Sequence, residues 1–82
     1  MNFKIEFSTQ AAKFIRNLSN DVKERIKKKF KEVSENPFRY LEHHEGDECY
    51  KLRISNFRAL IDINKNALFV RVFDKRERIY KR

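Results

Sequence analysis

Several residue types that mark common protein classes are nearly missing from this sequence. It has no tryptophan, and cysteine, glycine, proline and methionine each occur once in 82 residues. One cysteine cannot close an internal disulfide or build a zinc cluster, so we interpret Cys49 as a small apolar core residue. No apolar run approaches the ~20 residues of a membrane span. The opening MNFKIEF does not resemble a signal peptide. We therefore expect a cytoplasmic protein without a membrane partner.

Positive charge dominates the residues that are present. Twenty Lys and Arg stand against twelve Asp and Glu, which gives a net charge of +8. Such an excess favours a polyanionic partner, either nucleic acid, an acidic protein or an anionic membrane surface. Charged residues make up 39% of the chain. With so little glycine and proline, this composition is typical of a thermophilic or archaeal protein, and surface ion pairs are the alternative use of the charge.

The apolar pattern predicts a single small α+β domain over residues 1–82. FKIEF alternates apolar and charged residues, which indicates a strand at 3–7. Apolar residues at helical spacing then predict two helices joined by about two residues, an antiparallel helical hairpin that ends near Asn36, before Pro37. An antiparallel meander of three to four strands follows, at 49–54, 57–63, 67–73 and 76–81. Consecutive strands after two helices place both helices on one face of the sheet.

Two predicted turns, Ser55-Asn56 and Lys65-Asn66, decide which strand residues share a face. Directly opposed residues in a hairpin lie on the same side of the sheet. The first turn sets Arg53 against Arg58, and the second sets Arg58 against Phe73. The predicted core face carries Leu52, Ile54, Phe57, Ala59, Ile61, Val70 and Val72. The predicted exposed face carries Lys51, Arg53, Arg58 and Arg71, interleaved with Leu60, Phe69 and Phe73.

The exposed face fits a nucleic acid. Opposed arginines repel each other, and a bound phosphate backbone would compensate that repulsion. Exposed rings between cations also suit stacked bases. We therefore interpret a set of cations and rings on this face and in the tail as RNA-binding: Arg71, Lys75, Arg78, Phe69 and Phe73. The alternative is that the cations pair with Asp62, Asp74 or Glu77, or lie under the C-terminal tail.

Metal chemistry is not expected. His43 and His44 are flanked by acidic residues, but adjacent histidines point in different directions and no helical His-x-x-x-His spacing is present. The sequence therefore predicts neither a metal nor another cofactor.

The order of these features resembles the RelE toxins of bacterial and archaeal toxin–antitoxin systems. The features are the N-terminal strand with its Lys-rich helical hairpin, YKLRISNFRALIDI, ALFVRVF and the ending DKRERIY. The second is similar to the family's Y-K-L-R-x-G-x-Y-R-x-x-Y-x-I, and the last to K-R-x-x-V-Y. This chain has Ser55 or Asn56 in place of the turn glycine, Phe57 in place of a tyrosine, and one lysine in the strand where relatives often have two.

The resemblance implies a metal-independent endoribonuclease that cuts mRNA in the ribosomal A site. In the family, the ribose 2′-OH attacks the scissile phosphate and leaves a 2′,3′-cyclic phosphate. Lys51 and Arg53 match the strand that supplies general-base and phosphate-binding groups. Arg58 matches the arginine that stabilises the pentacoordinate phosphate, and Arg76 matches the one that protonates the leaving oxygen. Tyr80 matches the tyrosine that stacks on the cleaved nucleotide.

The resemblance also implies partners and leaves two alternatives open. The expected partners are mRNA in the ribosomal A site and an acidic, RelB-like antitoxin that wraps the toxin, in a complex able to oligomerise further. The first alternative is a ParE-like toxin, which shares the fold and inhibits DNA gyrase without cutting RNA. The second is an RNA-binding module without catalytic activity.

Overall fold

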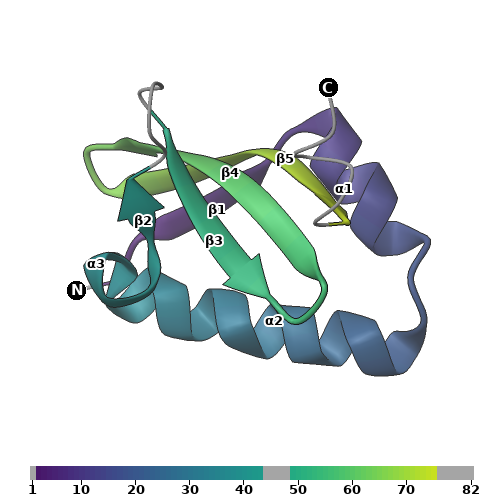
Figure 1. Cartoon of the computed structure of the whole chain (residues 1–82). Coiled ribbons are helices and arrows are strands. Elements are labelled where there is room, and N and C mark those ends of the chain that lie inside the picture. Colours follow the sequence, from purple (N-terminus) through teal and green to yellow (C-terminus); the bar gives the residue numbers. More distant parts are fainter. Residues whose placement is uncertain (1, 44–48, 76–82) are drawn as a thin grey trace.

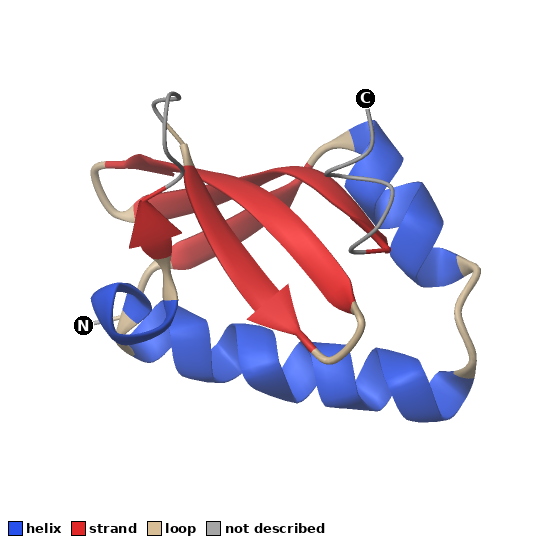
Figure 2. Ribbon diagram, viewed as in Figure 1, coloured by secondary structure: helices blue, strands red, loops and turns tan. Residues whose placement is uncertain are grey.

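A computed structural model describes residues 2–43 and 49–75 and shows a small α+β domain (Figure 1), as predicted. Figure 2 separates the helices from the single sheet that they cover. The elements run in the order β1 (Lys4–Phe7), α1 (Thr9–Arg16), α2 (Asn20–Glu35), α3 (Pro37–Tyr40), β2 (Glu42–His43), β3 (Tyr50–Ile54), β4 (Phe57–Asn64) and β5 (Ala67–Lys75).

The helices begin and end where local chemistry favours it. Ser8 caps α1, because its hydroxyl oxygen accepts a hydrogen bond from the Ala11 amide at 3.1 Å. Ser19 stands at the N-cap of α2 with extended backbone, and the helix ends at Glu35, two residues before Pro37. Pro37 opens α3, where its missing amide proton is not needed. A short turn joins α1 to α2, as predicted, and α1 packs mainly against β5.

The sheet has the strand order β1-β5-β4-β3-β2. The meander β3–β4–β5 is antiparallel, as predicted, whereas β1 joins the outer side of β5 in parallel. In Figure 1, α2 runs beneath the sheet and α1 lies at one end of it, next to β5. The two-residue β2 and the single-turn α3 were not predicted, because the segment after Pro37 was interpreted as a connection.

The first hairpin has the predicted register. Arg53 faces Arg58, Leu52 faces Ala59 and Lys51 faces Leu60. Leu52 and Ile54 are buried against the helices, so the inward face of β3 is confirmed. Its turn is tight, and Ser55 adopts a left-handed backbone with φ 55°.

The second hairpin departs from the predicted register by one residue. Ile61 faces Val70, as predicted, but Leu60 faces Val72, so Arg71 is an extra residue on β5 and forms a β-bulge. Beyond the bulge, Ala59 faces Phe73 in place of Val72. The predictions that Val72 belongs to the core face and that Phe73 is exposed are therefore wrong.

One apolar core holds the two layers together. The inward residues of β4 and β5 meet Ala11 of α1 and the apolar stripe of α2. Phe73 is fully buried among three other rings, with centroid distances of 5.9 Å to Phe14, 5.9 Å to Phe30 and 5.6 Å to Phe57. Cys49 is also buried, as expected. No helix among residues 2–43 and 49–75 is long and apolar enough to cross a membrane. The predicted strand at 76–81 lies outside the described residues.

Candidate functional site

The outer face of the sheet, away from the helices, carries the predicted cations of β3. Lys51 and Arg53 alternate with the buried Leu52 and therefore point to this face. Arg53 is exposed, and within residues 2–43 and 49–75 it forms no ion pair. Lys51 is half-buried, and its Nζ lies 3.9 Å from Oε1 of Glu42, the residue opposite it on β2.

Arg58 is on the same face. The sequence predicted that it would be exposed to solvent, and this prediction is wrong. Only 3% of the residue is exposed. Its strand neighbours are Arg53 on β3 and Asp74 on β5, because the bulge moves Asp74 into the position predicted for Phe73. A carboxylate-bearing residue therefore lies directly across from Arg58, which reduces the repulsion expected from the opposed arginines.

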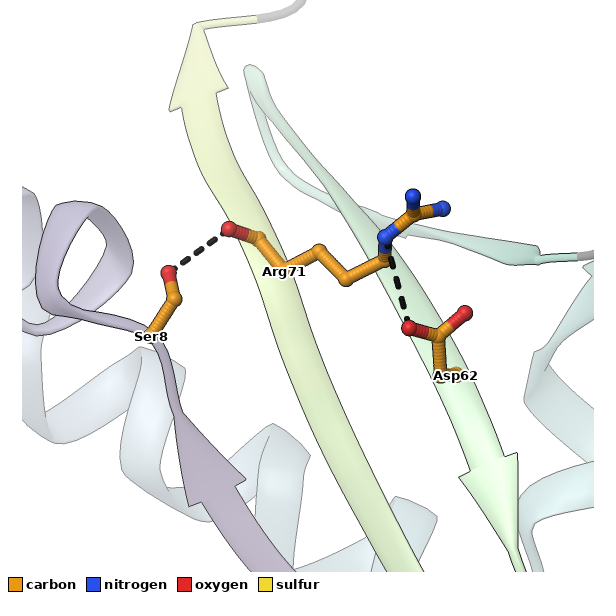
Figure 3. A network of polar contacts seen from close by, with 3 residues as sticks. All are labelled: Ser8, Asp62 and Arg71. Carbon is orange, nitrogen blue, oxygen red and sulfur yellow. Dashed lines mark hydrogen bonds and ion pairs between the residues drawn. The ribbon is translucent and has the colours of Figure 1, made fainter.

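Arg71, the bulge residue, links β5 to β4 and to Ser8, the N-cap residue of α1 (Figure 3). Its Nε lies 3.3 Å from Oδ2 of Asp62 on β4, and both side chains are well exposed. On its other side, the Ser8 hydroxyl donates a hydrogen bond to the Arg71 carbonyl at 2.6 Å. Arg71 therefore lies on the predicted face. It also pairs with Asp62, which was the predicted alternative to RNA binding.

The two phenylalanines predicted to bind RNA are on opposite sides of the sheet. Phe69 lies before the bulge, faces Asp62 and is 37% exposed. Phe73 lies after the bulge and is completely buried, so it cannot stack on a base. Lys75 ends β5 opposite Phe57 and is exposed. Arg76, Arg78 and Tyr80 lie outside the described residues.

Sequence reasoning missed one contributor to this face, Glu42, and could not place a second, Asp74. Glu42 was assigned to a connecting segment, and its place beside Lys51 follows only once β2 pairs with β3. Asp74 was considered as a counter-ion, but its position across from Arg58 depends on the bulge. Among residues 2–43 and 49–75, no three His, Cys, Asp or Glu side chains gather as metal ligands. His44 lies outside the described residues.

A second surface feature, an apolar groove, lies between β1 and α2. Its volume is about 640 Å³. Its floor is formed by the apolar side chains Phe3, Ile5, Phe7, Ile15, Ile26 and Phe30. Lys23, Lys27 and Lys31 follow one another at four-residue spacing along α2 and line the groove together with Glu24. These lysines form no ion pair within the described part of the chain.

Comparison with solved structures finds the same fold in RelE toxins. RelE in the RelBE2 toxin–antitoxin complex of Mycobacterium tuberculosis superposes with a TM-score of 0.79 at 18% identity, over 93% of this chain and 100% of that one. A mutant Escherichia coli RelE in the free state gives 0.76 at 29% identity, over 95% and 87%. RelE in the archaeal RelE–RelB complex of Pyrococcus horikoshii gives 0.76 at 16% identity, over 95% and 99%.

Comparison at the level of sequence identifies the family. No curated protein sequence matches the chain. The model of the ParE toxin of the type II toxin–antitoxin system parDE matches residues 5–79, nearly the whole chain. The chain therefore belongs to the ParE toxin family of type II toxin–antitoxin systems, and its fold is that of the solved RelE toxins.

Proposed function

We propose that the protein is a ribosome-dependent mRNA endonuclease that acts in the cytoplasm. The observation that carries this proposal is the outer sheet face around Arg53. This exposed guanidinium has no ion-pair partner among residues 2–43 and 49–75, and it lies directly across from Arg58. Lys51, Arg71 and the exposed ring of Phe69 share the face. Such a surface suits a phosphate backbone with an adjacent base.

The proposed reaction needs no metal. The 2′-oxygen forms a bond to phosphorus, the bond to the 5′-oxygen breaks, and the products are a 2′,3′-cyclic phosphate and a 5′-OH. In the roles that the resemblance implies, Lys51 takes the proton of the 2′-OH and Arg53 binds the phosphate. Positive charge around the phosphorane lowers the barrier because negative charge develops there. Arg76 would protonate the leaving oxygen, and Tyr80 would hold the nucleotide by stacking.

Burial limits what Arg58 can do in this state. At 3% exposure, its guanidinium contacts a phosphate only after the atoms that bury it move aside. Arg71 and Lys51 each lie beside a carboxylate, at 3.3 and 3.9 Å. An incoming phosphate would compete with Asp62 and Glu42 for them, and exposed pairs of this kind are weak enough to exchange.

The test is cleavage of a defined mRNA during translation by the purified protein, mapped by primer extension. We expect cuts in the ribosomal A site, and Arg53→Ala should lower the cleavage rate about a hundredfold, the effect of removing one charged transition-state contact. Arg16→Ala is the matched control, because Arg16 is an exposed arginine in the helix layer. Growth inhibition with intact ribosome-bound mRNA would rule out the nuclease.

The family match favours one alternative, inhibition of DNA gyrase without RNA cleavage. ParE toxins give the matching family its name. A supercoiling assay with the same preparation separates the two, since a gyrase inhibitor blocks supercoiling and leaves mRNA intact. An RNA-binding module would do neither and would only retain RNA.

For the antitoxin, we propose a RelB-like partner whose acidic, amphipathic segment binds in the groove between β1 and α2. The groove offers an apolar floor together with three lysines that form no ion pair with residues 2–43 or 49–75, and β1 is an edge strand of the sheet. Phe7 is 39% exposed there, although a phenylalanine gains free energy from burial.

This partner surface can be tested apart from the nuclease. Lys27→Glu should weaken antitoxin binding about tenfold or more, because it places a carboxylate against an acidic segment. RNA cleavage should be unchanged. Lys13→Glu on α1, outside the groove, is the control. Equal affinities of the two variants would place the antitoxin elsewhere.

A further inference from the structure

Beyond the end of β1, side chains form the hydrogen bonds to the edge of β5 that a neighbouring strand would form. Strand pairing with β1 runs from Ala67 to Val70, and the Ser8 amide then donates to the Val70 carbonyl at 2.9 Å. The next carbonyl, that of Arg71, accepts the Ser8 hydroxyl (Figure 3). After Ser8 the chain turns into α1, so no backbone of β1 remains to pair with the second half of β5.

Gln10, the second residue of α1, takes the place of the missing strand. Its Nε2 donates to the Phe73 carbonyl at 3.0 Å, and its Oε1 accepts from the Phe73 amide at 3.0 Å. In a primary amide one of the two N–H donors lies beside the carbonyl oxygen. The group can therefore bond to both backbone groups of one strand residue, as a neighbouring strand would. The contact joins residues 63 apart in the sequence.

The bonded residue is the one whose orientation the bulge changes. If β5 alternated regularly through Arg71, with Arg71 paired opposite Leu60, Phe73 would point outward, opposite Arg58. With it, Phe73 points into the core and Asp74 faces Arg58. Gln10 therefore holds the backbone at the position where the two registers differ.

We propose that Gln10 is a positioning residue that fixes the bulged register of β5 and thereby sets Asp74 across from Arg58. Its effect on activity rests on the proposed nuclease function, whereas its effect on β5 does not. Loss of the Gln10 amide should loosen the end of β5 without removing any group that touches RNA.

The first test is Gln10→Ala, with Thr9→Ala in the same turn of α1 as control. The hydrogen-exchange protection of the Phe73 amide should fall about tenfold in Gln10→Ala, as expected for two lost hydrogen bonds at a strand edge. For RNA cleavage, kcat should fall while KM and antitoxin affinity stay as in the wild type. Thr9→Ala should change none of these.

Gln10→Glu supplies a readout that a general loss of stability would not give. A protonated carboxyl can donate to the Phe73 carbonyl and accept from its amide, whereas a carboxylate can only accept. Since the folded state favours the neutral acid, the pKa of Glu in this variant should be raised above its unfolded value. The restored contact is then present at low pH and is lost as pH rises through that pKa. The chemical shift of the Phe73 amide should follow this titration in the variant and not in the wild type.

The outcomes of these experiments test the role of Gln10 separately from the proposed nuclease function. Unchanged Phe73 protection in Gln10→Ala together with a pH-independent Phe73 shift in Gln10→Glu would overturn the role of Gln10. Loss of protection with unchanged kcat would overturn its role in activity and leave the nuclease standing. A wild type that cuts no RNA would remove the nuclease, while the exchange and shift measurements would still decide how Gln10 acts on β5.

Discussion

The hairpins β3–β4 and β4–β5 share a strand and differ in regularity. Both have two-residue turns whose first residue is left-handed, Ser55 at φ 55° and Lys65 at φ 54°. The first keeps strict alternation along its length, whereas the second contains the bulge at Arg71. Turn chemistry alone therefore does not determine strand register. The bulged register is favoured because it buries Phe73 among rings from α1, α2 and β4.

Deleting one residue from each hairpin should produce the largest contrast. Deletion of Arg71 removes the extra residue, so Phe73 stays opposite Ala59 and the core survives. The cost should be about 1–2 kcal/mol, the ordinary size of a single-site change. Deletion of Arg53 turns the residues before it to the wrong face, exposes Leu52 and should unfold the protein, at about 3–5 kcal/mol or more. Urea unfolding of both variants measures this. If both deletions lowered the free energy of unfolding equally, β5 would need its extra residue as much as β3 needs Arg53.

The two phenylalanines on either side of the bulge give the next contrast. Phe73→Ala should lower the free energy of unfolding by about 3–5 kcal/mol, because it empties a fully buried site. Phe69→Ala, at an exposed site, should change it by less than about 1 kcal/mol and instead weaken RNA binding. Thermal unfolding and RNA affinity, measured on both variants, check the assignment. Loss of RNA binding without loss of stability in Phe73→Ala would contradict the buried position.

Substitutions in the two turns should change the free energy of unfolding least, and by the same amount in both hairpins. Ser55→Gly and Lys65→Gly remove the cost of a left-handed residue with a Cβ, partly offset by the greater freedom of glycine in the unfolded chain. Each should raise the free energy of unfolding by about 0.5–1 kcal/mol, and the double variant by the sum, since the turns are separate. Asn64→Gly, in extended strand, is a control expected to destabilise. Destabilisation by either turn variant would show that its side chain is needed.

Much of the fold could be predicted from the sequence because it depends on local signals. Apolar spacing and Pro37 predicted the helices α1 and α2, and two short turns predicted the meander. Placing Arg53 across from Arg58 needed only the turn between them. In contrast, β2 and α3 have too few residues for any periodicity, and the parallel pairing of β1 with β5 joins opposite ends of the described chain.

The candidate site also has a part that the sequence predicted and a part that it did not. Lys51, Arg53, Phe69 and Arg71 lie on the predicted outer face, because alternation holds up to the bulge. Beyond it the prediction fails, since Phe73 is buried and Asp74 replaces it beside Arg58. The roles of Arg76, Arg78 and Tyr80 remain predictions, as these residues lie outside the described chain.

The sequence by itself determined α1, α2, the strands of the meander and the pairing of β3 with β4, since each depends on residues a few positions apart. Its composition also determined the basic character of the chain. Only the tertiary structure decided the register at the end of β5. That choice rests on Phe14, Phe30 and Gln10, which are distant in sequence and meet Phe73 only in the folded protein. The alternation of residues along a strand cannot predict such distant partners. The free energy gained by burying one large ring exceeds the cost of one irregular residue in the strand.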